Sequence, residues 1–266
     1  MQRQAQGLGC VHLSLDLRVH DELSRALERY SAKAAAGAIL DVTNGEIVAL
    51  VSLPDFDPNE PTGMLEDGRF NRITAAKFEV ASIFKTMTIA GALDSGAIGL
   101  DDKVDARTSV RFGRHTISDY YGRNRVMSVR EVFQYSSHIA TIRIMQAMGK
   151  TQFRAFLTRM GFDDRPQIEL PELTNSAIPS SFSDVVAATA SFGHGLSVTP
   201  LQMLVAQGAL VNGGYLLRPT VFRQSEPSLE EGLRVVSVET SDRIRFLLRL
   251  NALEGSGRRA NDLVSE

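Results

Sequence analysis

Two apolar runs separated by Asn44-Gly45 constrain the fold of this chain more than any other local feature. They lie in the stretch AGAILDVTNGEIVALVSL. Asn-Gly is the strongest short-range signal for a β-hairpin, because both residues tolerate the positive φ angles of a tight turn. We therefore predict that residues 37–43 and 46–52 pair antiparallel. Since a lone hairpin is not stable in water, it must pair with further strands or pack on helices.

Helical patterns dominate the rest of the chain. VHLSLDL (residues 11–17) alternates like a strand, and residues 19–36 then carry the apolar stripe of a helix. Further helices are predicted over 82–95, from the Ser128 cap, over 139–148 and 151–160, from Thr199 to Gly213-Gly214, and over 240–253. Short strands and turns are expected over 101–127. Because strands and helices do not alternate, the fold class is α+β, with helices packed on an antiparallel sheet.

Composition excludes several classes of function. The 266 residues are 43% hydrophobic and 23% charged, which is ordinary for a globular protein. The net charge of −2 does not indicate a basic surface that would bind nucleic acid. One cysteine excludes an internal disulfide framework. The five histidines show no ligand spacing, so neither a metal site nor a cofactor is predicted. No apolar run is long enough for a membrane span, and no signal peptide opens the chain.

The stretch FEVASIFKTMTIAGALDSG places Ser82 three residues before Lys85 at the start of an apolar segment. The macrodipole disfavours a cation in a first helical turn. One interpretation is an ordinary serine cap beside a surface lysine. In the other, the Lys85 amine takes the proton of the Ser82 hydroxyl, since residues three apart share a helix face. That role requires apolar neighbours to lower the lysine pKa.

Two more blocks accompany this motif: YSSHIATIRIM, with Ser136 and Ser137 in a turn between helices, and SFGHGLSVTPLQM. In this order and at these separations, the three blocks resemble the class B penicillin-binding proteins, the D,D-transpeptidases that cross-link peptidoglycan. The details are similar to the division-specific subgroup. The resemblance covers nearly the whole chain and implies the penicillin-binding/β-lactamase-like transpeptidase fold.

The resemblance also implies roles for individual residues. Ser82 is the expected nucleophile toward the D-Ala-D-Ala carbonyl of a stem peptide or toward a β-lactam. Lys85 is the expected base, and Ser136 the expected proton relay to the leaving group. The residues expected along the bound substrate are Ser137, His138, Gly193 and His194.

The same resemblance implies an activity, partners and a location. The expected function is serine-type acyl transfer between stem peptides during septal wall synthesis. Division-complex membrane proteins are expected partners of the full-length form, at the periplasmic face of the cytoplasmic membrane. The chain as given carries neither the family's membrane anchor nor its non-catalytic pedestal region, so residues 1–266 are expected to be one incomplete transpeptidase domain.

Three departures from the family pattern stand out. His138 occupies a position that is usually Asn, whose reach and charge differ from those of an imidazole. Ala81 and Ile83 replace a Gly and a Thr beside the nucleophile. No Lys-Thr-Gly motif occurs, and the chain stops at Glu266, so strands that follow in the family are expected to be missing and activity weak or absent. Alternatives are a non-catalytic scaffold that binds division partners, and a β-lactamase or D,D-carboxypeptidase of the same fold.

Overall fold

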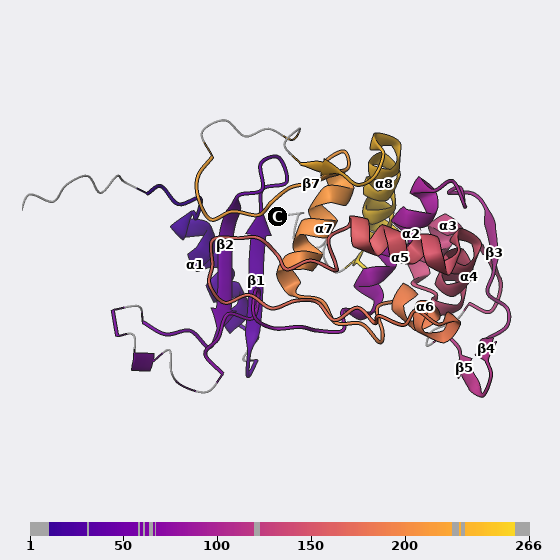
Figure 1. Cartoon of the computed structure of the whole chain (residues 1–266), viewed down its shortest axis with the longest axis horizontal. Coiled ribbons are helices and arrows are strands. Elements are labelled where there is room, and N and C mark those ends of the chain that lie inside the picture. Colours follow the sequence, from indigo (N-terminus) through magenta and orange to yellow (C-terminus); the bar gives the residue numbers. More distant parts are fainter. Residues whose placement is uncertain are drawn as a thin grey trace, which may run out of the picture.

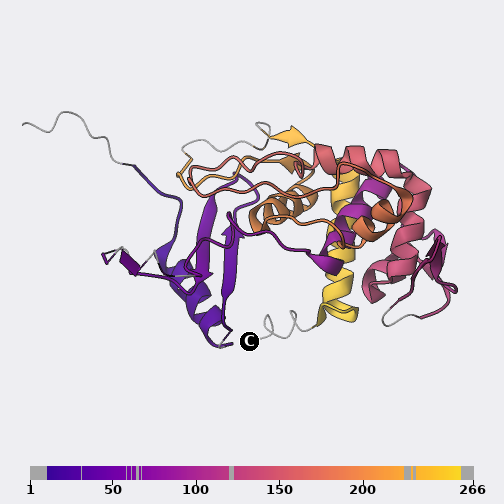
Figure 2. The ribbon, with the colours of Figure 1, turned by 60° about the horizontal axis from the view of Figure 1, so that its bottom comes forward.

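The computed structural model describes residues 11–30, 32–57, 59–60, 62–63, 66, 68–119, 123–224, 229 and 232–258. A β-hairpin occupies one end of the molecule and a group of helices the other (Figures 1 and 2). No helix in this described part is both long and apolar enough to cross a bilayer. The prediction about a missing Lys-Thr-Gly strand concerns the chain end at 261–266, which lies outside the described residues.

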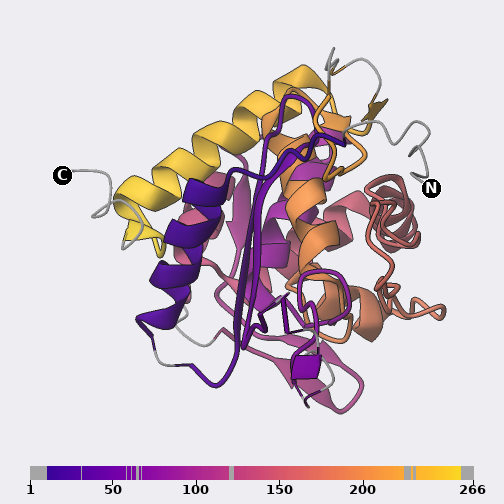
Figure 3. The same ribbon diagram turned by 90° about the vertical axis from the view of Figure 1, so that its left-hand side faces the viewer.

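The hairpin is covered by one helix on each face. β1 (Ala35–Leu40) pairs antiparallel with β2 (Ile47–Leu53), α1 (Leu17–Glu28) contacts β2, and α7 (Pro200–Val211) contacts β1. Figure 3 shows the hairpin between these two helices. Glycines allow both close approaches. An added Cβ would lie 3.1 Å from Leu23 of α1 at Gly37, and 3.1 Å from Leu40 of β1 at Gly208. The predicted packing of the hairpin on helices is therefore confirmed.

The turn of the hairpin differs from the two-residue turn predicted at Asn44-Gly45. Pairing stops at Leu40 and Ile47 after a bulge, so residues 41–46 form the connection. The Asp41 carboxylate accepts a hydrogen bond from the Thr43 N–H at 2.9 Å, and only Gly45 adopts a positive φ, of 81°. The aspartate thus stabilises a wider turn by bonding to its own backbone, which a short Asn-Gly turn does not require.

The strand predicted over residues 11–17 is wrong. Within this segment Leu13 forms a single bridge to Phe222, and the helix α1 already begins at Leu17. The Asp16 carboxylate caps this helix by accepting the Arg18 N–H at 2.9 Å. The helix also ends at Glu28 and not at residue 36, because β1 begins at residue 35. The capping aspartate and the strand set boundaries that the apolar pattern alone did not reveal.

The second end of the molecule is mostly helical. Its helices are α2 (Lys85–Asp94), α3 (Val129–Tyr135), α4 (His138–Met148), α5 (Lys150–Arg159), α6 (Asp184–Ser191) and α8 (Val238–Glu254). Helix α2 is the centre of this group: residues 85–93 are all buried, and α4, α5 and α8 contact it. A helix buried on all sides is mostly apolar, as the segment from Met87 to Leu93 is, and the buried Lys85 at its start is an exception that requires a reason.

Short strand pairs connect the helices. β3 (Lys103–Asp105) pairs with β6 (Val126–Ser128), β4 (Val110–Phe112) with β5 (His115–Ile117), and β7 (Tyr215–Leu216) with β8 (Leu233–Arg234). The predicted short strands over 101–127 are therefore confirmed. In the described part of the chain every sheet contains two strands.

Two helix starts follow the capping rules on which they were predicted. The Ser128 hydroxyl accepts the Glu131 N–H, and the Glu131 carboxylate accepts the Ser128 N–H at 2.8 Å, which completes a capping box. Thr199 caps α7 with Pro200 at its first position. Both α3 and α7 pack on α8, and the turn that links α3 to α4 meets the beginning of α2 through the contact of Ser136 with Lys85.

Candidate active site

Ser82 lies in a 3₁₀ turn, η2 (Ala81–Phe84), directly before α2. The helix itself begins at Lys85, later than the predicted residue 82. The Ser82 hydroxyl caps neither the turn nor the helix, so the interpretation of Ser82 as an ordinary N-cap is wrong. Ser82 is exposed, whereas Phe84 and Lys85 are buried. The turn therefore presents the serine to solvent and points the lysine inward.

Lys85 is buried and forms hydrogen bonds to Ser136, the residue that ends α3. Its side chain is 4% exposed, and Nζ donates to Ser136 Oγ at 2.8 Å and to the Ser136 carbonyl oxygen. Burial lowers the pKa of Lys85 to about 7, and the negative charge of Asp119 opposes this by raising it. A substantial fraction of the amine is consequently neutral near pH 7, as a base for a serine hydroxyl must be.

Ser136 and Ser137 form the turn between α3 and α4, but their side chains point to different partners. Ser136 adopts the left-handed conformation, with φ 57° and ψ 44°, which turns its hydroxyl toward Lys85. Ser137 caps α4: its Oγ accepts the Ala140 N–H at 3.0 Å. Its hydroxyl also donates to Asp119 Oδ2 at 2.7 Å. One serine thus faces the lysine while the next holds the helix.

Asp119 is a residue of this site that sequence reasoning missed. It follows β5 and accepts hydrogen bonds from the Ser137 hydroxyl, the His138 N–H and the Ile139 N–H, the last at 3.0 Å. No spacing rule connects residue 119 to residues 137–139, and the sequence offers no local signal for the contact.

The imidazole of His138 is part of a stack of three rings. It lies parallel to the Phe192 ring, with centroids 4.6 Å apart, and Phe192 is in turn parallel to His194 at 6.4 Å. Burial lowers the pKa of His138, the charge of Lys85 lowers it further, and Asp119 acts in the opposite direction. The neutral imidazole is therefore the favoured form near pH 7.

The segment from Gly193 to Gly195 lies against the residues that precede the nucleophile. The Ala81 N–H donates to the Gly193 carbonyl oxygen at 3.1 Å. Gly193 has a φ of 82°, and a Cβ there would lie 2.1 Å from the Ala81 oxygen. Glu79 completes the contact, accepting the Gly195 N–H at 3.0 Å and pairing with His194 Nδ1 at 2.6 Å. Gly193 thus combines a positive φ with a close backbone approach, and only glycine accommodates both without strain.

A cavity of about 340 Å³ joins the two serines and the lysine. Its walls come from the nucleophile turn, the α3–α4 turn, α7 and α8, and its lining includes Ser82, Lys85, Thr86, Ser136, Gln207, Leu248, Asn251 and Ser256. The three side chains with acyl-transfer chemistry therefore open into one space.

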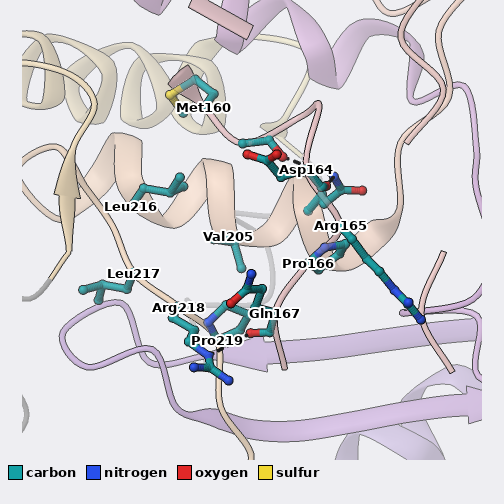
Figure 4. Close-up of a pocket in the computed structure, with 12 residues that line it drawn as sticks. Met160, Asp164, Arg165, Pro166, Gln167, Val205, Leu216, Leu217, Arg218 and Pro219 are labelled. Atoms are coloured by element: carbon teal, nitrogen blue, oxygen red, sulfur yellow. Dashed lines mark hydrogen bonds between the residues drawn. The ribbon is translucent and has the colours of Figure 1, made fainter. Parts of the chain in front are cut away.

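A second cavity, of about 400 Å³, lies between the segment after α5 and residues 216–219 (Figure 4). Its lining contains no serine, lysine or histidine. Arg165 and Arg218 are its cations, and each donates to a main-chain oxygen, of Leu173 and Gln167 respectively. Asp164 is the carboxylate of this cavity, but no serine or lysine lines it, so it lacks the serine–lysine combination found in the first cavity.

Comparisons with known proteins agree with this geometry. Residues 35–265 match the family described as the penicillin binding protein transpeptidase domain. The chain is 36% identical over 254 residues to the probable peptidoglycan D,D-transpeptidase FtsI of Caulobacter vibrioides, covering 94% of this chain and 43% of that protein. It spans about two fifths to three fifths of the curated relatives that it matches first.

Two solved structures share the fold. The transpeptidase domain of penicillin-binding protein 3 from Burkholderia pseudomallei matches with a TM-score of 0.80 and 27% identity, over 95% of this chain and 73% of that one. Penicillin-binding protein 3 from Mycobacterium tuberculosis, crystallised with aztreonam, matches with a TM-score of 0.81 and 25% identity, over 91% and 58% of the two chains.

Proposed function

The chain belongs to the family of penicillin-binding protein transpeptidase domains, and on that premise we propose that it is the acyl-transfer domain of a peptidoglycan D,D-transpeptidase. One observation carries the proposal: a buried lysine with a pKa near 7 shares a cavity with an exposed serine and donates to a second serine at 2.8 Å. A nucleophile, a base and a relay are the groups that serine acyl transfer requires.

In the first half of the proposed reaction, Ser82 is acylated. Its Oγ attacks the carbonyl carbon between the two D-alanines of a stem peptide, and neutral Lys85 accepts the hydroxyl proton. The C–N bond then breaks, and the proton passes through Ser136 to the nitrogen of the departing D-alanine. The 2.8 Å contact between Lys85 Nζ and Ser136 Oγ supports this path, because a proton moves readily along such a hydrogen bond.

In the second half, the amine of another stem peptide attacks the ester carbon. Its proton passes to the basic pair Lys85 and Ser136 and returns to Ser82 as the C–O bond breaks. The products are a cross-linked peptide and free enzyme. Because a β-lactam presents a strained amide with a carbonyl of the same kind, the proposed nucleophile also opens that ring and retains the acyl group.

The proposed substrate-binding surface consists of His138, Gly193 and His194 together with the main chain beside Ser82. The stacked rings and the close contact of Gly193 with Ala81 support a continuous wall along one side of the nucleophile. The Ser137 hydroxyl already bonds to Asp119 and to the Ala140 N–H. Ser137 is therefore proposed to act by holding the turn in place and not by touching the peptide.

We propose that the protein acts in septal wall synthesis, at the periplasmic face of the cytoplasmic membrane. Similarity to the Caulobacter relative named FtsI supports this subgroup. Division-complex membrane proteins are its proposed partners, stem peptides its substrates and β-lactams its inhibitors. The likeness to a relative crystallised with aztreonam supports the last of these.

The test is intact-mass spectrometry after incubation with benzylpenicillin. The wild-type chain is expected to gain the mass of one penicillin, and Ser82→Ala to gain none. Ser95→Ala is a matched control, since Ser95 is an exposed serine at the far end of the same helix. The proposal is wrong if folded wild-type protein gains no adduct, or if the adduct persists in Ser82→Ala.

A further inference from the structure

Asp119 connects the segment after β5 to the start of α4. It lies in the segment that connects the β4–β5 hairpin to β6, and its carboxylate reaches the first turn of α4. Both oxygens are used: Oδ2 accepts the Ser137 hydroxyl at 2.7 Å, and Oδ1 accepts two successive backbone N–H groups, of His138 and Ile139. Three donors converge on a single side chain.

These contacts complete the cap of α4. The first N–H groups of a helix lack partners within the helix, and a negative charge there is favourable. Ser137 satisfies the Ala140 N–H, and Asp119 satisfies the two preceding ones. The aspartate therefore fixes where the helix begins, and with it the orientation of the turn immediately before.

Ser136 is the residue that this turn places. It adopts the left-handed conformation, and both its Oγ and its carbonyl oxygen accept from Lys85 Nζ. A left-handed serine persists only where surrounding contacts hold it. Because Ser137 and His138 are tied to Asp119, a change at residue 119 shifts the oxygens that face the lysine.

Asp119 also carries a negative charge that acts on the buried ammonium and raises the pKa of Lys85. Among the described residues, the charge of Asp119, from the segment after β5, acts on Lys85, while Lys85, Asp119 and His194 act on the imidazole of His138, from α4. The cavity walls contributed by α7, α8 and the segment after α8 are uncharged there, with Gln207, Leu248, Asn251 and Ser256. Removing the aspartate therefore removes the one charge among the described residues that raises the pKa of Lys85.

We propose that Asp119 is a positioning residue of the acyl-transfer centre, which holds the Ser136–His138 turn against Lys85 and provides the counter-charge of the buried ammonium. Its hydrogen-bond partners are residues 137–139, and Ser82 is not among them. Its role in the reaction rests on the function proposed above, whereas its effect on Lys85 does not.

The chain contains a matched carboxylate for the test. Glu131 caps α3 as Asp119 caps α4: it accepts the Ser128 N–H at 2.8 Å and the Ser128 hydroxyl at 3.2 Å. No interaction between Glu131 and Lys85 affects the lysine pKa. Glu131→Gln therefore removes a helix-capping charge of the same kind without removing the counter-charge of Lys85.

The first experiment follows the lysine directly. The chain has five lysines, so a sample labelled with ¹³C at the lysine Cε carbons gives few NMR signals, and Lys85→Arg assigns the one of interest. In wild type that signal is expected to titrate near 7. Asp119→Asn is expected to lower the midpoint by about one pH unit, since an opposite charge favours the protonated amine. Glu131→Gln is expected to leave it in place.

The second experiment measures the rate of penicillin acylation against pH. Because Lys85 must be neutral to act, the acylation rate falls at pH values below the lysine pKa. Asp119→Asn should shift this acidic limb of the profile to lower pH. It should also lower the maximal rate, the plateau at higher pH, at least about tenfold. Asp119→Glu restores the charge but displaces the oxygens by one methylene. It should keep the wild-type limb and still lower the plateau, and it is informative even if Asp119→Asn does not fold.

The outcomes separate the two proposals. An unchanged lysine midpoint in Asp119→Asn, or an equal shift in Glu131→Gln, overturns the counter-charge role. A wild-type acylation rate in Asp119→Glu overturns the positioning role. If wild type is not acylated at all, the proposed function fails, and the NMR titration still decides whether Asp119 is the counter-charge of Lys85.

Discussion

Lys85 Nζ lies 2.8 Å from Ser136 Oγ, and this contact joins the centre of the helical core to the turn between α3 and α4. The lysine is 4% exposed, so its ammonium form is desolvated and its pKa falls to about 7. Burying a cation destabilises a fold unless the charge is paired and hydrogen-bonded. In the proposed reaction the buried lysine serves as a base beside a serine. The destabilisation caused by its burial can be measured.

Lys85→Met should change the dependence of stability on pH. The folded-state pKa of Lys85 is lowered from 10.5 to about 7, so between these values the unfolded chain binds more protons and stability rises with pH. Below pH 7 the burial penalty, on the order of 5 kcal/mol, is fully present. The free energy of unfolding of Lys85→Met minus that of wild type should therefore decrease from pH 7 to pH 10.5, as measured by urea titration.

Lys150→Met controls for the general loss of a lysine. Lys150 lies at the surface, where it pairs with Asp184. Its stability difference from wild type should change little over the same pH range. A difference for Lys85→Met that stays flat with pH would contradict the assignment of a depressed lysine pKa.

Gly193→Ala should damage both the fold and the nucleophile. A Cβ at this position would lie 2.1 Å from the Ala81 oxygen, so the main chain next to Ser82 must move. We expect a loss of more than about 2 kcal/mol in the free energy of unfolding and at least a tenfold loss of penicillin acylation. Gly149→Ala is the matched control, because Gly149 has a similar φ, 88°, and nothing within 4 Å of an added Cβ. Equal effects of the two substitutions would rule out the contact with Ala81 as the cause.

Gln202→Leu should destabilise the junction at the start of α7. The amide nitrogen donates to the main-chain oxygens of Gly161 and Asp164, and the amide oxygen accepts from the hydroxyls of Ser176 and Thr199. Leucine fills a similar volume but leaves these partners without a bond, at about 2–4 kcal/mol in total. Gln146→Leu, on the exposed surface of α4, should change the free energy of unfolding by less than about 0.5 kcal/mol. Thermal and urea unfolding of both variants provide the comparison.

His138→Asn should lower stability although it places an amide where the family usually has one. The imidazole stacks on Phe192 with a centroid distance of 4.6 Å and an interplanar angle of 7°, and an amide makes a smaller contact. We expect a loss of about 1 kcal/mol. His115→Asn makes the same chemical change at an exposed histidine in β5, which stacks on no ring among the described residues, and should be close to neutral. Comparable losses for the two variants would argue against the stack.

Much of the fold could be predicted because local rules decide it. The helix starts at Ser128 and Thr199 follow from capping partners three residues away, and both are present. The apolar segment after Ser82 predicted a buried helix, which α2 is. Predictions were wrong where a local rule had a competitor. Asp16 starts a helix where the alternation of residues 11–17 indicated a strand, and Asp41 widens the turn predicted at Asn44-Gly45.

The sequence by itself determined which segments form helices, since spacing and capping act within a few residues, and its resemblance to a family indicated the side chains that we propose for the chemistry. Only the tertiary structure decided how those side chains behave. Burial lowers the lysine pKa, Asp119 meets residues 137–139, and Gly193 meets Ala81 across more than a hundred residues. Such contacts and the removal of water arise from packing between distant segments. No periodicity in the chain encodes them, because they depend on which surfaces exclude solvent together.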